Sequence, residues 1–280
     1  MSRIDSLNKT VVPFRAPEIH NDIANFDKEK YFFFDKHWNA MERFFVLDNF
    51  QNTFYNWMEK DLHEYNFYPV NGSTEAIQQC LQTLSSTKKI IAILPNEYNY
   101  YRIVASLYNI EIRFIKTILD IDSNCVFITS IPFCRDGKIS ILQQQLLNKC
   151  NEDNIECWID CAYIGTGKSV EFIIPKNTTN IFFTFSKNFA LSFNRIGIWL
   201  SKHQITTLEM LKDYGYLPLG NLSLVTMLMQ KYNKSYMWNN YRTLQEAVTD
   251  CPTDIVFLDD NGCITNKMTK LIIDRYDCNR

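Results

Sequence analysis

The chain has 280 residues, of which 46% are hydrophobic and 14% aromatic, which is enough to bury a sizeable α/β core and excludes a disordered or fibrous protein. Its 29 Lys and Arg residues nearly balance 31 Asp and Glu residues, for a net charge of -2. With no basic run long enough to follow a phosphate backbone, nucleic acid is not an expected partner.

The ends and the cysteines indicate a cytoplasmic protein without a membrane anchor. The N-terminus lacks a secretory signal, and no window approaches the roughly 20 apolar residues of a membrane span. The nine cysteines form no Cys-x-x-Cys pair and the four histidines do not cluster. Neither a disulfide framework nor a metal site is therefore expected.

The N-terminal third predicts an arm followed by a helix. Residues 1–45 are irregular and rich in aromatic side chains, a composition suited to packing against another surface. Residues 48–65 predict a helix. Residues 70–77 then read Val-Asn-Gly-Ser-Thr-Glu-Ala-Ile and run into a further helix.

From residue 90 onward, short apolar runs alternate with helical patterns. Near-continuous apolar strands of this kind favour a mostly parallel sheet covered on both faces, a three-layer α/β/α fold. The expected strands are 90–94, 110–115, 125–129, 155–160, 181–185 and 196–200, and the expected helices between them are 98–108 and 140–151.

After residue 200 the pattern is helical and then ends in two short strands. Helices are expected over about 203–212, 219–231 and 242–249, and strands over 254–258 and 270–274. We divide the chain into an arm (1–45), a large domain (46–205), and a region (206–280) that completes it and forms a reduced small domain.

The strongest chemical signal is a Ser-Lys pair delivered by a strand. Ser186-Lys187 follows the run 181–185, and Arg195 follows eight positions later, before Gly197. An amine can form an imine with an aldehyde, while a hydroxyl and a guanidinium suit a phosphate group. Alone, the pair would equally fit a solvated lysine and a surface arginine.

Three further segments carry polar or aromatic groups at the end of a strand or the start of a helix. Asp160-Cys161-Ala162-Tyr163 follows a buried strand, Gly72-Ser73-Thr74 opens a helix whose dipole attracts anions, and Tyr98 begins the helix after the strand 90–94. Each has a plain structural alternative. The aspartate could cap a loop, the Ser-Thr turn could cap its helix, and the nearby Tyr101 could be a core residue.

Taken in chain order, from the Gly72 turn through Tyr98 and Asp160 to Lys187 and Arg195, these four segments resemble the fold-type I pyridoxal-5′-phosphate (PLP) aminotransferases of class I/II. The resemblance covers about residues 65–200. The resemblance implies that Lys187 holds PLP as a Schiff base and that Asp160 pairs with the pyridine nitrogen. It assigns the ring's phenolic oxygen to Tyr163 and the pyridine face to Tyr98. The phosphate then falls to Gly72, Ser73, Thr74, Ser186 and Arg195.

The chain departs from that family at two places. Cys134 stands where the family has an asparagine that bonds the phenolic oxygen, and a thiol is a weak donor. Lys270 stands where an arginine would hold the substrate carboxylate, and Arg275 is a second candidate. Lysine cannot make the bidentate fork, so carboxylate recognition would differ from that of ordinary transaminases.

The resemblance implies a homodimer that acts at the Cα of an amino acid or its oxo acid, most simply as an aminotransferase. A PLP-dependent lyase or decarboxylase, or a PLP-fold subunit without catalysis, are the alternatives. A nucleotide-binding P-loop at Ala162–Ser169 is rejected, because such a loop must open a helix and residues 170–175 read as a β-rich run ended by proline.

Overall fold

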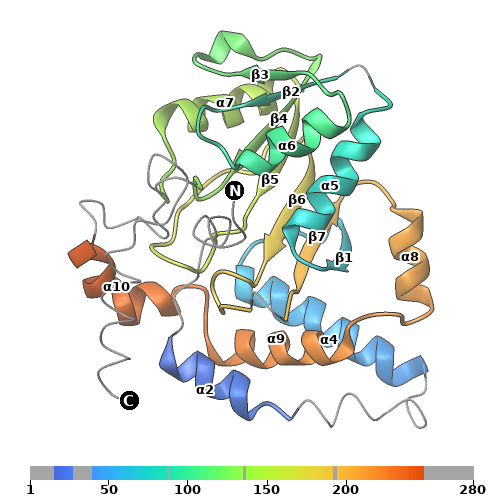
Figure 1. The fold of residues 1–280 in the computed structure, drawn as a ribbon, viewed down its shortest axis with the longest axis vertical. Coiled ribbons are helices and arrows are strands. Elements are labelled where there is room, and N and C mark those ends of the chain that lie inside the picture. Colours follow the sequence, from blue (N-terminus) through green and yellow to red (C-terminus); the bar gives the residue numbers. More distant parts are fainter. Residues whose placement is uncertain (1–15, 28–39, 88, 135–136, 192–193, 249–280) are drawn as a thin grey trace, which may run out of the picture.

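A seven-stranded sheet with the strand order β1-β7-β6-β5-β4-β2-β3 forms the centre of the protein (Figure 1). The computed structural model describes residues 16–27, 40–87, 89–134, 137–191 and 194–248. Strands β3, β2, β4, β5 and β6 are mutually parallel, whereas β7 is antiparallel to both β6 and β1. The mostly parallel α/β sheet expected from the alternating apolar runs is therefore confirmed. The strands are β1 Asn66–Val70, β2 Ile90–Ile93, β3 Ile112–Phe114, β4 Cys125–Ser130, β5 Glu156–Asp160, β6 Thr178–Thr184 and β7 Gly197–Ser201.

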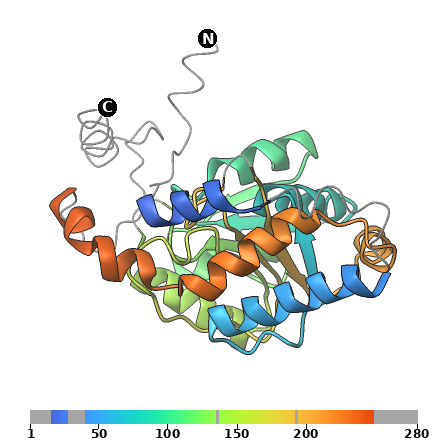
Figure 2. The ribbon, with the colours of Figure 1, turned by 90° about the horizontal axis from the view of Figure 1, so that it is seen from below.

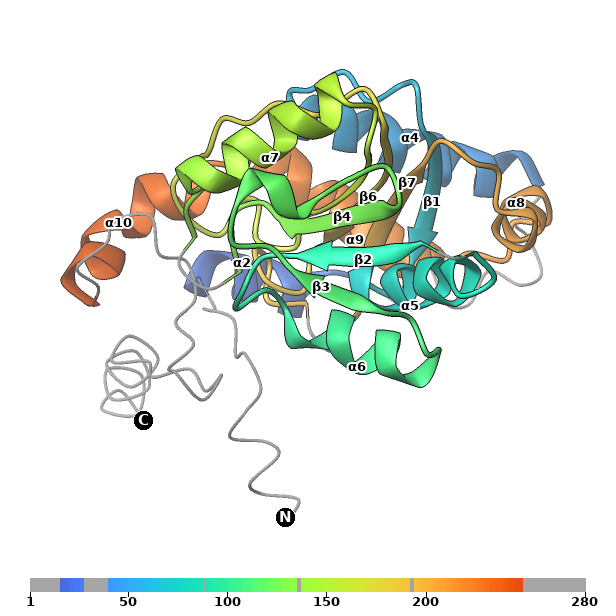
Figure 3. The ribbon, with the colours of Figure 1, turned by 90° about the horizontal axis from the view of Figure 1, so that it is seen from above.

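Helices cover both faces of this sheet. Helices α4, α7 and α9 lie on one face and α5, α6 and α8 on the other, and Figure 3 shows α4 and α7 across the strands from α5 and α6. The described helices are α2 Pro17–Asn25, α4 Ala40–Met58, α5 Ser73–Leu84, α6 Asn99–Leu107, η2 Ile118–Asp120, α7 Ile141–Glu152, α8 Thr206–Asp213, α9 Leu219–Lys231 and α10 Tyr236–Val248.

The strands supply one core on each face because successive side chains point to opposite sides. Along β6, Ile181 and Phe183 enter the core under α4 and α9, while Phe182 enters the core under α5 and α6. The first core is strongly aromatic. The rings of Phe54 and Phe183 meet edge to face, with centroids 4.8 Å apart, and hold α4 against the sheet.

The first 65 residues differ from the sequence-based expectation. The predicted helix 48–65 is α4, which begins at Ala40 and ends at Met58, and the unpredicted strand β1 follows it. Strand β1 (Asn66–Val70) was not expected because its sequence, Asn-Phe-Tyr-Pro-Val, begins with a polar residue and contains a proline, which argues against a strand interior.

The arm expected to be irregular contains α2. Its Ile19 is buried, and its Asp22 pairs with Lys231 at the end of α9. Figure 2 shows α9 flanked by α2 on one side and α4 on the other. The described part of the arm thus packs on its own chain.

The C-terminal helices agree with the sequence in position, apart from α10. Helix α9 has the expected bounds, whereas α10 begins at Tyr236 rather than near 242. The expected strands 254–258 and 270–274 lie outside the described residues, and the division into domains stays a prediction. Among the residues that the structure describes, no helix combines the length and hydropathy needed to cross a bilayer.

Candidate active site

Five chain segments meet at one edge of the sheet. Strands β2, β4, β5 and β6 are parallel, so their carboxyl ends share this edge, and β1 ends here too because β7 reverses direction between it and β6. Val70 and Thr184 both lie beside Gly197 in the register. Ligands of open α/β sheets bind beyond such carboxyl ends, so the edge is the place to look for a site.

Lys187 lies in the turn that follows β6. Burial and, to a smaller extent, the positive charge of Arg195 lower the pKa of its ammonium group to about 8, while the carboxylate of Asp160 acts in the opposite direction. A lysine in this state has far more neutral amine at neutral pH than a solvated lysine has. Lys187 is therefore equipped to act as a nucleophile.

Asp160 ends β5 and is 2% exposed. Its Oδ1 accepts a 3.0 Å hydrogen bond from the N–H of Ala162, and its Oδ2 accepts a 2.8 Å bond from the hydroxyl of Tyr101. Burial raises the pKa of the carboxyl to about 6, while these two hydrogen bonds and the charge of Lys187 oppose the rise. A buried carboxylate of this kind suits a cationic N–H partner.

Tyr101 is one of two site residues that the sequence did not assign to the site. It is fully buried on α6, as expected of a core residue, but its hydroxyl is bound to Asp160. The sequence signal that could have assigned Tyr101 to the site is its spacing. It lies three positions after Tyr98, so the two side chains fall on the same side of the helix. The two rings pack edge to face, with centroids 5.6 Å apart.

A Gly-Ser-Thr turn joins β1 to α5 and faces Arg195. Gly72 has φ 88° and ψ 161°, a conformation that only glycine adopts readily. A Cβ on Gly72 would come within 2.9 Å of Nη2 of Arg195, so the missing side chain lets the guanidinium approach the turn. Arg195 donates from Nε to the Asn71 carbonyl (3.1 Å) and from Nη2 to Thr74 Oγ1 (3.3 Å).

The donors around this turn suit a phosphate group. Ser73 and Thr74 begin α5, where the first N–H groups of a helix have no partner within the helix and its dipole is positive. The hydroxyl of Thr184 lies next to the turn, because a Cβ built on Gly72 would come within 3.4 Å of its Oγ1. The Ser186 hydroxyl is 3.0 Å from the same oxygen, so Ser186 also lies beside the turn. Together with Arg195, these groups form a cradle for an anion.

Two tyrosines extend the site. Tyr98 is 38% exposed, its phenol lies close enough to the side chain of Thr74 and to the charge of Asp160 for both to affect its pKa, and its ring packs edge to face on that of Tyr101. Tyr163 is buried in the turn after β5. Burial raises the pKa of its phenol well above the ordinary value, and Cys134 and Asp160 are close enough to raise it further.

Cys134 follows β4 and is 4% exposed. Its Sγ lies 3.5 Å from the Asn96 carbonyl and 3.6 Å from Oε2 of Glu97. Glu97 was not among the predicted site residues. The sequence signal that could have identified Glu97 is its position. It is a carboxylate three residues after the apolar run 90–94, so it falls at the same carboxyl ends of the strands as Asp160.

Two predicted residues cannot be placed. Lys270 and Arg275 lie outside the described residues. The other ten predicted positions lie at or next to the carboxyl edge of the sheet, on the turns after β1, β2, β4, β5 and β6 and in the segment before β7.

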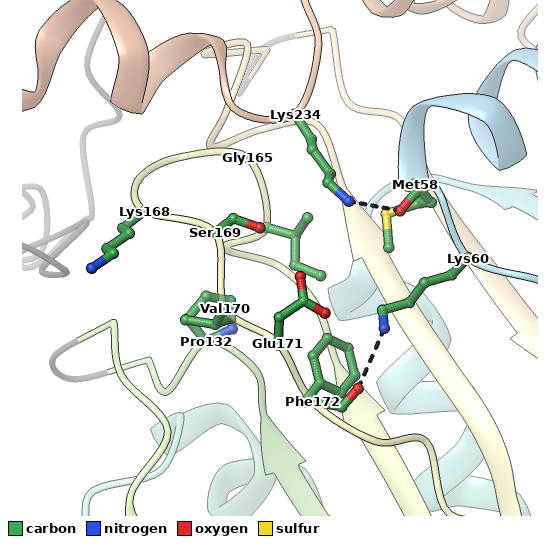
Figure 4. Close-up of a pocket in the computed structure, with 11 residues that line it drawn as sticks. Met58, Lys60, Pro132, Gly165, Lys168, Ser169, Val170, Glu171, Phe172 and Lys234 are labelled. Carbon is green, nitrogen blue, oxygen red and sulfur yellow. Dashed lines mark hydrogen bonds between the residues drawn. The ribbon is translucent and has the colours of Figure 1, made fainter.

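A pocket beside this edge is lined by the segment that resembled a P-loop (Figure 4). Lys60 donates to the Phe172 carbonyl at 3.3 Å, and Lys234 donates to the Met58 carbonyl at 3.1 Å. Residues 168–175 form neither a helix nor the expected β-rich run. The geometry of a P-loop, which opens a helix, is therefore absent from this described segment.

Comparison with known proteins decides the family. The sequence profile described as "Aminotransferase class I and II" matches residues 35–246. The chain belongs to the class I and II aminotransferase family. It is an enzyme of the PLP-dependent aminotransferase type, and pyridoxal phosphate is the cofactor of that family. No curated protein matches the sequence.

The solved structures show the same fold at low identity. An aspartate aminotransferase from Thermotoga maritima is 12% identical with a TM-score of 0.60, and the match covers 87% of this chain and 75% of that one. An L-threonine-O-3-phosphate decarboxylase from Porphyromonas gingivalis is 16% identical with a TM-score of 0.57, covering 86% and 74%. An aromatic-amino-acid aminotransferase from Burkholderia pseudomallei, covalently bound to pyridoxal phosphate, is 14% identical with a TM-score of 0.55. That match covers 71% of this chain and 63% of the other, less than two thirds of its length.

The residues of this aminotransferase-family site fit pyridoxal phosphate. The turn Gly72-Ser73-Thr74 together with Arg195 suits the phosphate group, and the buried carboxylate of Asp160 suits a protonated pyridine nitrogen. The low-pKa amine of Lys187 suits the aldehyde.

Proposed function

We propose that this enzyme acts at the Cα of an amino acid or its oxo acid, most simply as an aminotransferase, with Lys187 as the residue that binds the cofactor covalently. The observation that carries the proposal is that Lys187 lies within electrostatic reach of both Asp160 and Arg195. A surface lysine would have neither its lowered pKa nor these two neighbours.

Each predicted residue has a role in this proposal. Arg195, Ser186 and the turn Gly72-Ser73-Thr74 hold the phosphate. Asp160 keeps the pyridine nitrogen protonated, and Tyr101 orients that carboxylate through its 2.8 Å hydrogen bond.

The remaining site residues contact the ring and move the proton. Tyr98 covers one face of the ring, Tyr163 donates to the phenolic oxygen, and Cys134 lies near Tyr163. When bound, pyridoxal phosphate supplies an electron sink for the charge that develops at Cα. Lys187 is the base that takes and returns the Cα proton, because burial lowers the pKa of its ammonium group to about 8 and so brings the neutral amine within reach near neutral pH.

Two alternatives stand beside transamination. The decarboxylase from Porphyromonas gingivalis has the same fold, so fold alone does not choose which bond to Cα breaks. The bond that breaks depends on how the substrate carboxylate is held, and we assign that task to Lys270, with Arg275 as the second candidate. A non-catalytic subunit is the other alternative, which the intact set Lys187, Asp160 and Arg195 opposes.

Assembly and location are part of the proposal. We infer a cytoplasmic homodimer, because enzymes of this family are typically dimeric and the N-terminal arm is rich in aromatic side chains. Light scattering of the cofactor-loaded protein at micromolar concentration should give about twice the chain mass of 33.1 kDa. A single-chain mass would contradict the dimer.

The decisive experiment is covalent labelling. Protein loaded with pyridoxal phosphate is reduced with borohydride, digested and mapped. The pyridoxyl group is expected on Lys187, and Lys187→Ala should abolish both the label and the visible absorption band. A label on another lysine would overturn the assignment. Release of an oxo acid from the right amino acid supports transamination, whereas release of carbon dioxide or ammonia supports the lyase or decarboxylase alternative.

A further inference from the structure

Lys187 lies in a closed turn between two stacked aromatic rings. The Phe185 carbonyl accepts hydrogen bonds from the N–H groups of Phe189 (3.3 Å) and Leu191 (3.4 Å), which closes the chain around Lys187. The rings of Phe185 and Phe189 are buried and stack on each other, with centroids 5.8 Å apart and planes 7° from parallel. The Phe189 N–H also donates to Oδ1 of the buried Asn188 at 2.9 Å. The turn that carries Lys187 is therefore anchored in the core by the residues on both sides of the lysine.

Trp57, near the end of α4, packs against both of these rings. Its ring centroid lies 6.1 Å from that of Phe185 and 6.2 Å from that of Phe189, and the planes cross at 62° and 61°, so it meets both edge to face. The side chain is buried, and its indole N–H donates a 2.9 Å hydrogen bond to the carbonyl of Tyr232, the residue directly after α9. That bond fixes the direction of the indole, which is therefore held between α9 and the turn of Lys187.

The same indole also contacts the turn after β5. Gly165, two residues after Tyr163, has φ 82°. A Cβ on Gly165 would come within 2.9 Å of Cη2 and 3.0 Å of Cζ2 of Trp57, and within 3.3 Å of Nδ2 of Asn188. Only a residue without a side chain lets the turn approach the indole this closely in that backbone conformation. One ring therefore contacts both the turn that carries Lys187 and the turn that carries Tyr163.

We propose that Trp57 is a positioning residue that fixes the turn of Lys187 relative to the turn of Tyr163. The proposal rests on the proposed function, in which Lys187 binds the cofactor covalently and Tyr163 donates to its phenolic oxygen. Pairing between β5 and β6 ends at Asp160 and Phe182, so both turns extend past it and need a further contact to fix them. A misplacement of about 1 Å between reacting groups can lower a rate by about a hundredfold. Trp57 acts by packing and touches none of the reacting groups.

Loosening this contact should be visible in the ionisation of Lys187. Burial is the main cause of its lowered pKa of about 8, and the two charged groups that face the amine are Arg195, which also lowers the pKa, and Asp160, which raises it. A turn that moves away from Trp57 admits water to the ammonium group, so the pKa of Lys187 should rise toward that of a solvated lysine. A substitution that only lowers the free energy of unfolding leaves this pKa unchanged in the molecules that remain folded. The pKa of Lys187 therefore separates a positioning role from a purely structural one.

The first experiment needs no cofactor. The protein is labelled with acetic anhydride over a range of pH, and peptide mapping gives the labelling midpoint of Lys187, with the exposed Lys176 as internal reference. The midpoint is expected near pH 8 in the unmodified protein and about one pH unit higher in Trp57→Leu. Trp199→Leu is the matched control, because Trp199 is also buried and its indole N–H has a partner in Asn180 (2.8 Å), but it lies in the other core. A midpoint unchanged in Trp57→Leu, or shifted equally in both variants, would overturn the proposal.

A second variant tests the contact from the other turn and covers the case in which Trp57→Leu does not fold. Gly165→Ala places a Cβ against Cη2 and Cζ2 of Trp57, so it should also raise the labelling midpoint of Lys187. Phenylalanine has no counterpart of these two atoms, so Gly165→Ala should shift the midpoint less in the Trp57→Phe protein than in the unmodified one. Gly215→Ala, at another glycine with positive φ, should leave the midpoint unchanged. No shift in Gly165→Ala, or an equal shift in both backgrounds, would contradict the role of Trp57.

The last measurement uses pyridoxal phosphate itself. An increase of about one pH unit in the pKa of Lys187 lowers the fraction of neutral amine at pH 7 about tenfold. Capture of pyridoxal phosphate at pH 7 should therefore be about tenfold slower in Trp57→Leu and unchanged in Trp199→Leu. Equal capture rates in Trp57→Leu and the unmodified protein would count against the proposal. A borohydride label on a lysine other than Lys187 would instead contradict the proposed function, whereas the labelling midpoints of the cofactor-free protein stand apart from it.

Discussion

The hydroxyl of Tyr101 donates a 2.8 Å hydrogen bond to Oδ2 of Asp160, and both residues are buried. This bond connects α6 to the end of β5 and fixes the direction of the carboxylate. Because Oδ1 is bound by the Ala162 N–H, both oxygens of Asp160 are held from the protein side. In the proposed function, a positively charged N–H of a bound ring would therefore meet a carboxylate that is already oriented.

Replacing Tyr101 with phenylalanine should weaken this orientation without changing the core volume. A hydrogen bond to a charged group contributes about 1.5–3 kcal/mol, so kcat/KM should fall by roughly tenfold or more. Because the bond lowers the pKa of Asp160, its loss should also move the acid limb of the pH–rate profile upward. Tyr100→Phe is the control, since the Tyr100 hydroxyl bonds Gln78 at the surface. Equal effects of the two variants would refute the role of Tyr101.

Asp160→Ala should separate catalysis from cofactor retention. Removing the carboxylate leaves the pyridine nitrogen unprotonated, so turnover should fall by orders of magnitude while the phosphate contacts still bind pyridoxal phosphate. Turnover and cofactor content are measured on the same preparation, with the exposed Asp213→Ala as the control. Retained activity would mean that another residue holds the nitrogen.

The rate of cofactor capture should depend on the ionisation of Lys187. Only the neutral amine attacks an aldehyde, and burial lowers the pKa of Lys187 to about 8. The rate of appearance of the visible band after mixing with pyridoxal phosphate should therefore rise with pH, reach half its maximum near pH 8 and level off above about pH 9. Lys176→Ala, at an exposed position, should leave the profile unchanged. A rate still rising steeply above pH 9 would indicate an ordinary solvated lysine.

Gly72→Ala should weaken cofactor binding through the phosphate cradle. The backbone conformation costs about 1–3 kcal/mol for any residue with a side chain, and the new Cβ would press on the guanidinium of Arg195. The dissociation constant of pyridoxal phosphate should rise about tenfold or more. Gly215→Ala is a matched control, because Gly215 also has positive φ but contacts Arg43 far from the site. Similar losses of affinity in both variants would point to general destabilisation.

The substrate carboxylate anchor is tested by two variants. If Lys270 holds the carboxylate, Lys270→Ala should raise KM for the amino acid with a smaller effect on cofactor binding, because uniform binding energy is lost. The same measurement on Arg275→Ala distinguishes the second candidate. An unchanged KM in both variants would place the anchor elsewhere.

Much of the fold and of the site follows from local patterns. The buried runs that became β2, β4, β5 and β6 are apolar on both faces, a composition that favours a central parallel sheet, whereas the equally apolar run of β7 pairs antiparallel with both neighbours. The strand-end positions of Asp160 and Lys187 follow from the same pattern, since the carboxyl ends of parallel strands share an edge. Strand β1 was not predicted, because its sequence Asn-Phe-Tyr-Pro-Val contains a proline, which normally argues against a strand interior.

The contacts between segments were decided by the tertiary structure. The sequence by itself determined that a lysine, an aspartate and an arginine follow strands in an order typical of pyridoxal-phosphate enzymes. It did not determine that Tyr101 bonds Asp160 or that Glu97 contacts Cys134, because both pairs join residues far apart in the chain. Such bonds depend on how α6 packs against the sheet and on how the turns after β2 and β4 lie side by side. The pKa that makes Lys187 reactive near neutral pH arises in the same way, since burial exists only once the layers have packed.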